Sequence, residues 1–106
     1  MEGGERSGTV HARVVDLTVR SVDTKEMVRV YREEVVPAAR EQEGFKGAML
    51  LTDPQTGIGI SITIWETEAE REAAVSGGFY DEKIEKFAAL LTETLVRKHY
   101  DVSLMV

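Results

Sequence analysis

Apolar and polar residues alternate along both ends of the chain, the pattern of a β-strand with two different faces. Thr9 to Arg20 is rich in β-branched residues, and its alternation changes phase between Val14 and Val15. We therefore expect either a bulge in this strand or apolar burial on both of its faces. Val96 to Val106 alternates again and predicts a last strand.

A hairpin is predicted between these ends, from Phe45 to Trp65. Its strands are expected at Lys46 to Thr52 and Ile58 to Glu66, around the sequence Asp-Pro-Gln-Thr-Gly. Pro and Gly at these places favour a type I turn closed by a left-handed glycine. Along the second strand, four isoleucines share one face, and the other face carries Gly59, Ser61, Thr63 and Trp65.

The hairpin register depends on the turn. Simple pairing sets Leu50 opposite Ile60 and Met49 opposite Ser61, and a bulge at Gly57 shifts each pair by one residue. The turn therefore decides which side chains of the two strands lie opposite each other.

Helical spacing follows the first strand and the hairpin. One apolar stripe runs from Met27 to Gln42 at steps of three and four residues, and Pro37 predicts a kink or a restart near Val36. A short helix begins after Thr67 and ends at the Gly77-Gly78 pair. A further helix is expected from Phe79 to about Thr92, with an inner stripe of Tyr80, Ile84, Phe87 and Leu91.

The predicted order is β-α-β-β-α-β, the split, ferredoxin-like α+β arrangement. Right-handed crossovers place the helices on one face of a four-stranded antiparallel sheet and leave the other face bare. Sizeable apolar residues occur on both faces of the first and third strands, so we expect a second subunit's sheet to cover the bare face.

Composition limits the classes of function. The 106 residues suit a single domain, expected at residues 9–106 after a flexible lead-in at residues 1–8. A net charge of −6 argues against nucleic acid or an anionic membrane as a partner. The chain has no cysteine, which excludes thiol chemistry. It has neither a long apolar run nor a signal-peptide pattern, so we expect a cytoplasmic protein.

Short motifs flank the hairpin. Gly44-Phe45-x-Gly47 precedes it, and its second strand ends in Trp65-Glu66-Thr67-Glu68. In this respect the chain resembles the antibiotic biosynthesis monooxygenase family of the dimeric α+β barrel group, over about Val10 to Val106.

The resemblance implies a homodimer with face-to-face sheets and an apolar pocket between each sheet and its own helices. The group includes cofactor-independent oxygenases, haem-degrading enzymes and proteins without an established activity. The haem-degrading branch uses a helical Trp, a helical His and an Asn on the first strand. The corresponding positions here hold Ala73, Glu82 or Lys83, and Val15, so neither haem nor another cofactor is expected.

Three residues are candidates for catalysis under the oxygenase hypothesis. Trp65 would donate its indole N–H, Tyr31 would position the substrate, and His99 would act as the base. The alternatives are that Trp65 closes the core opposite Phe45, that Tyr31 is a core tyrosine, and that His99 is a solvated strand histidine. Candidate substrate contacts are Ser61, Thr63, Tyr80 and Phe87.

The two histidines, His11 and His99, fall on the first and last strands, which are neighbours in this topology. Asp101 shares the predicted face of His99 and is placed to orient its imidazole. A third ligand at helical spacing is missing, so no metal site is expected.

Three functional hypotheses follow. The first is a cofactor-independent monooxygenase acting on a small aromatic or enolisable molecule. The second is a non-catalytic dimer that binds a small apolar ligand or another protein, and the third is a structural domain with a filled core. A cavity beside Trp65 and Tyr31 would distinguish the first two from the third.

Overall fold

The computed structural model describes residues 10–76 and 87–106. Within them the predicted order of strands and helices is confirmed, and the class is α+β. The strands are β1 (Val10–Thr18), β2 (Phe45–Asp53), β3 (Ile58–Trp65) and β4 (Val96–Val102). The helices are α2 (Thr24–Val30), α3 (Val36–Arg40) and α4 (Glu68–Ser76), with a 3-10 turn at Ser21–Asp23 and a π-helical turn at Tyr31–Val35. Three predicted features lie outside the described residues: the lead-in at residues 1–8, the start of the helix expected from Phe79, and Tyr80.

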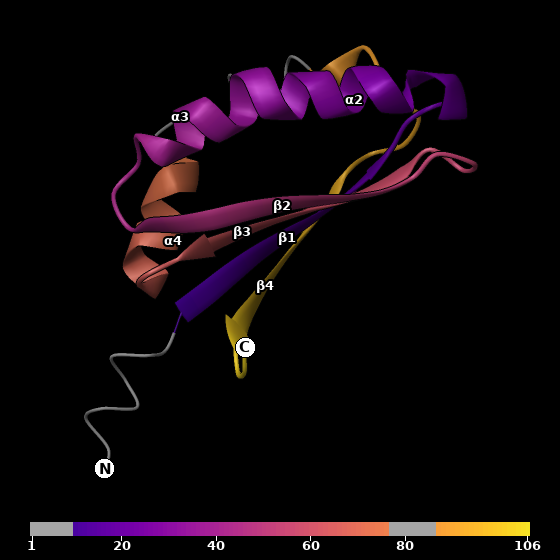
Figure 1. Cartoon of the computed structure of the whole chain (residues 1–106). Coiled ribbons are helices and arrows are strands. Elements are labelled where there is room, and N and C mark those ends of the chain that lie inside the picture. The colour runs from indigo at the N-terminus through magenta and orange to yellow at the C-terminus, as the bar shows by residue number, and fades with distance from the viewer. Residues whose placement is uncertain (1–9, 77–86) are drawn as a thin grey trace.

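The four strands form one antiparallel sheet in the order β2-β3-β1-β4. Figure 1 shows α2 and α3 running along one face of this sheet, while the opposite face carries no helix of the described chain. This is the predicted ferredoxin-like topology with helices on one face.

The β2–β3 hairpin has the shifted register. Leu50 pairs with Ser61 and Met49 with Ile62, so simple pairing of Leu50 with Ile60 was wrong. Gly57 is the cause: it adopts the left-handed conformation (φ 82°), and its N–H donates to the Asp53 carbonyl oxygen at 2.8 Å. The loop is thereby one residue shorter than simple pairing assumes.

The first strand has two apolar faces and no bulge. Its pairing with β3 and β4 is unbroken through the change of phase at Val14 and Val15. Val15, Leu17 and Val19 pack beneath the helices, while Ala12 is buried and Val14 half-buried on the opposite face. The second of the two expectations, burial on both faces, is the correct one.

The first helix restarts at Val36, as Pro37 predicts. Pro37 has no N–H and its ring crowds the preceding turn, and this turn is π-helical, with the Val36 N–H bonded to the Tyr31 carbonyl. The buried residues Met27, Tyr31, Val35 and Ala39 recur every four residues. That period exceeds the 3.6 of an α-helix, and the wider turn keeps all four facing the sheet.

Candidate functional site

The face of β3 beneath the helices is the polar one. Ser61, Thr63 and Trp65 are 8%, 2% and 0% exposed, whereas Ile58 on the opposite face is 47% exposed. The other three isoleucines are half-buried. Ser61 and Thr63 therefore face the layer between sheet and helices in which the site is predicted. The isoleucines point to the other side of the sheet, which carries no helix of the described residues and is called the open face.

Tyr31 and Ser61 meet in this layer. The Tyr31 hydroxyl lies 2.9 Å from the Ser61 Oγ, and it also donates to the Met49 carbonyl oxygen at 3.4 Å. Tyr31 directly follows α2 and lies four residues after the buried Met27, on the same buried side of the helix. The two hydroxyls supply two protons, and their bonds to each other and to Met49 use both, so a ligand's oxygen would have to replace one of these acceptors.

Trp65 lies at the end of the same line. Its indole N–H donates to the Thr63 Oγ1 at 2.9 Å, and the Phe45 ring packs edge-on against it at 5.6 Å between ring centres. These contacts are those of a buried anchor that closes the core opposite Phe45. Donation to a substrate oxygen would require this N–H to exchange Thr63 for the substrate.

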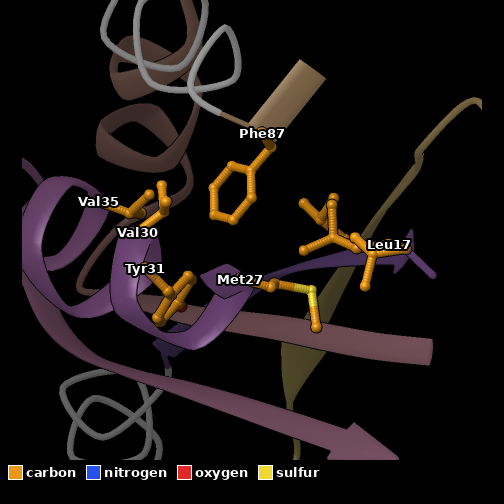
Figure 2. Close-up of a cluster of buried hydrophobic side chains, with 8 residues drawn as sticks. Leu17, Met27, Val30, Tyr31, Val35 and Phe87 are labelled. Atoms are coloured by element: carbon orange, nitrogen blue, oxygen red, sulfur yellow. The ribbon is translucent and has the colours of Figure 1, made fainter. Parts of the chain in front are cut away.

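Phe87 belongs to the apolar cluster of the core. Figure 2 shows its ring reaching from the last helical segment toward Val30 and Val35, and Leu17 belongs to the same cluster. Tyr31 and Met27 belong to the same cluster. Phe87 therefore forms part of the apolar wall around the Tyr31 ring, and Tyr80 lies outside the described residues.

His99 stands apart from Tyr31. It pairs with Arg13 on β1, which in turn pairs with Thr63, so two strand spacings (about 10 Å) separate His99 from Thr63. Burial, together with the positive charges of Arg13 and Arg71, lowers the pKa of His99, although the nearby Glu72 carboxylate acts in the opposite direction. The imidazole is therefore neutral near pH 7, the state a general base requires.

His11 has the partner that was predicted for His99. His11 pairs with Asp101 across β1 and β4, and its Nδ1 lies 2.9 Å from the Asp101 Oδ1. His99 instead has Glu72 at 3.7 Å. The prediction that Asp101 orients His99 was wrong, because neighbours two apart on a strand lie farther from each other than directly paired residues on adjacent strands.

Two buried arginines were missed from the sequence. Arg13 is 2% exposed on β1 and Arg71 is 5% exposed on α4. Arg71 forms ion pairs with Glu72 at 3.0 Å and with Glu68 at 3.5 Å. The signal was available, because Arg13 shares the buried alternation phase of Val15 and Leu17.

The described residues carry no group of three metal-binding side chains. None of the helices in residues 10–76 and 87–106 has the length and apolar character to cross a membrane.

Three surface hollows formed by described residues lie away from Tyr31. One of about 810 Å³ lies between α2 and the tip of the β2–β3 hairpin, one of about 280 Å³ lies between Gln42 and Glu70, and one of about 250 Å³ lies on the open face around Met49 and Ile64. None of these three is lined by Tyr31, Ser61 or Trp65.

No family model matches the sequence, and no curated protein matches it either. Solved structures do match. A monooxygenase from the gene ActVA-Orf6 of Streptomyces coelicolor, in complex with nanaomycin D, superposes with a TM-score of 0.75 and is 18% identical, covering 96% of this chain and 93% of that one.

Two further structures agree. A putative antibiotic biosynthesis monooxygenase from Nitrosomonas europaea has a TM-score of 0.71 at 14% identity, covering 86% of this chain and 88% of its own. SnoaB, a cofactor-independent oxygenase from Streptomyces nogalater, has a TM-score of 0.70 at 15% identity, covering 92% and 96%. The chain therefore has the fold of the antibiotic biosynthesis monooxygenases, as the motifs around its hairpin predicted.

Proposed function

We propose that this protein is a cofactor-independent monooxygenase of the cytoplasm, acting on a small aromatic or enolisable metabolite between the sheet and the helices. The observation that carries the proposal is the Tyr31–Ser61 hydroxyl pair, placed in a buried layer beside the apolar cluster of the core. Its fold is shared with a structure described as a cofactor-independent oxygenase.

The proposed reaction needs no resident redox group, because the substrate supplies the electrons. A phenol-like or enolisable CH₂ group loses a proton, and its delocalised anion passes one electron to O₂. The two radicals combine to a hydroperoxide, which loses water and leaves a carbonyl. One oxygen atom enters the product and the other leaves as water, so the equation R₂CH₂ + O₂ → R₂C=O + H₂O balances.

The protein's part is to hold the anion and exclude water. Tyr31 and Ser61 donate to the substrate oxygen in exchange for the bonds that their hydroxyls make to each other and to the Met49 carbonyl oxygen, and Phe87 packs against its apolar body. His99, neutral at pH 7, accepts the proton. Because Arg13 of β1 lies between Thr63 and His99, one substrate contacts both Ser61 and His99 only if it extends across β1, over Arg13. Trp65 contributes a donor only when Thr63 releases its N–H.

Oxygen consumption with a panel of anthrones and hydroquinones tests the proposal. Uptake is expected with at least one compound, and Tyr31→Phe should lower the rate about 10- to 100-fold if its hydroxyl stabilises the anion. Ser103→Ala removes a hydroxyl from an exposed residue beyond the end of β4 and should leave the rate unchanged. No uptake with any compound would contradict catalysis.

The rival proposal is a dimeric ligand-binding or protein-interaction domain, and one observation favours it. Tyr31 with Ser61, and Trp65 with Thr63, already satisfy each other's hydroxyl and indole groups. Native mass spectrometry of the freshly purified protein discriminates between the two. A small molecule retained by the wild type, together with an absence of oxygen uptake, would favour binding.

We also propose that the open face is a homodimer interface. It carries four isoleucines, with Met49 at 52% and Leu51 at 45% exposure beside them. Contiguous apolar surface of this kind marks an interaction site. Because the sheets of the resembling family pack face to face, we assign this face to a second copy of the chain.

Light scattering during size exclusion tests the dimer, which is expected at about twice 11.8 kDa. Ile62→Lys places a charge in the middle of the open face and should give a monomer, because a buried unpaired charge is costly. Val22→Lys makes a similar change at a residue that is 78% exposed on the helix side, and should remain dimeric. A monomeric wild type at micromolar concentration would overturn the assignment.

A further inference from the structure

The largest of the three hollows described above lies outside the Tyr31–Ser61 site. We call it the α2 groove. It runs between α2 and the tip of the β2–β3 hairpin and has a volume of about 810 Å³. The lining residues that matter are Val22, Lys25, Val28, Arg32, Thr52 and Pro54. Small-molecule sites typically measure about 300–1,000 Å³, so the groove is large enough for an organic ligand.

Two cations line this groove. Lys25 and Arg32 are exposed, and no carboxylate of the described chain lies within ion-pair distance of either one. Arg29, between them in sequence, is engaged by Glu26 at 2.6 Å and Glu33 at 3.0 Å. In a chain with a net charge of −6, two uncompensated cations along one groove form a local site for anions.

Their separation sets the shape of the ligand. Lys25 and Arg32 are seven residues apart, about two helical turns or about 10 Å along the axis. Val28 lies between them on the same side of the helix, and Val22 and Pro54 add apolar surface. The groove therefore presents a cation at each end of an apolar wall.

We propose that the α2 groove binds an elongated molecule with an apolar centre and an anionic group at each end, such as an aromatic dicarboxylate. The apolar centre covers Val28 and the exposed Val22, and each carboxylate pairs with one of the two cations. This site is separate from the proposed oxygenase site and does not rest on that proposal.

The probe is 2,6-naphthalenedicarboxylate, titrated into the full chain with amide NMR detection. 2-Naphthoate, with one carboxylate, and the dimethyl ester, with none, are the matched probes. We expect shifts at Val22, Lys25, Val28 and Thr52, and an affinity that falls about two- to five-fold with each carboxylate removed, the range for exposed ion pairs. Shifts that map elsewhere, or equal affinity for the ester, would overturn the proposal.

Two variants test whether Lys25 and Arg32 each bind one carboxylate of the probe. Lys25→Gln and Arg32→Gln should each reduce the dicarboxylate affinity to about that of 2-naphthoate for the wild type. Arg40→Gln removes the same charge on α3, outside the groove lining, and should change nothing. If all three variants bind alike, or if the wild type shows no shifts at millimolar probe, the groove is not a site for such dianions.

Discussion

The hydrogen bond between Tyr31 and Ser61 joins the helix layer to the sheet, and its coupling energy can be measured. Tyr31 comes from the π-helical turn and Ser61 from the middle of β3, and both are less than 10% exposed. Tyr31→Phe removes one partner, Ser61→Ala removes the other, and the double variant removes both. Each substitution keeps the size of the side chain nearly constant, so packing changes little.

The magnitude follows from what each variant leaves behind. Tyr31→Phe leaves the Ser61 hydroxyl buried without its 2.9 Å partner, which costs about 1–3 kcal/mol. Ser61→Ala costs somewhat less, because the Tyr31 hydroxyl retains the Met49 carbonyl oxygen at 3.4 Å. In the double variant neither hydroxyl is left without its partner. The loss of unfolding free energy should therefore be smaller, by about 1 kcal/mol, than the losses of the two single variants added together.

Urea unfolding followed by tryptophan fluorescence is the assay. Trp65 is the only tryptophan and is fully buried, so its emission reports the loss of the core. All variants are compared at one protein concentration, since a dimer's apparent stability depends on concentration. Ser103→Ala is the control, because the hydroxyl it removes belongs to an exposed serine beyond the end of β4.

Additive costs would refute the reasoning. If the double variant loses as much stability as the two single variants together, the two hydroxyls do not depend on each other. The buried layer between helix and sheet would then not be organised around this pair, and the site proposed on it would lose its anchor.

Two further predictions concern the hairpin turn and His99. Gly57→Ala should destabilise the protein by at least about 1–2 kcal/mol, because the left-handed backbone disfavours a Cβ and this Cβ would collide with the Val19 carbonyl oxygen. Gly47→Ala, where a Cβ meets open space, is the matched control for thermal unfolding and should have little effect. The NMR titration of His99 should show a pKa below its ordinary value of about 6.5, and Glu72→Gln should lower that pKa further. The unfolded chain then binds a proton that the folded chain does not. The free energy of unfolding should therefore decline as the pH falls through and below about 6.5. A midpoint of the His99 titration at or above that value would contradict this prediction.

Local chemistry was enough to predict the elements and the fold. The Pro-Gln-Thr-Gly turn, the restart at Val36 and the alternation of β3 each depend on residues close together in the sequence. The π-helical turn was also visible in principle, since buried residues four apart from Met27 to Ala39 exceed the α-helical period. The hairpin register was less certain, because one left-handed glycine changes every pair.

The site was harder to predict because its contacts join distant parts of the chain. Tyr31 and Ser61 are 30 residues apart, and only the rotation of the helix over the sheet brings their hydroxyls together. Alternation placed Asp101 and His99 on one face but did not give the register that joins Asp101 to His11. Spacing within one strand does not determine partners across strands.

The distribution of side chains over the two faces of β3 connects the proposed dimer to the proposed site. A sheet covered by helices on one face ordinarily points its isoleucines at those helices, because apolar burial is the main favourable term of folding. Here the helices cover Ser61 and Thr63, and the four isoleucines lie on the face that carries no helix of residues 10–76 and 87–106. Buried hydroxyls need partners and add little stability, so this arrangement is unfavourable for an isolated subunit. It becomes favourable if a second sheet buries the isoleucines, and the layer beneath the helices is then free to carry polar groups that act on a ligand.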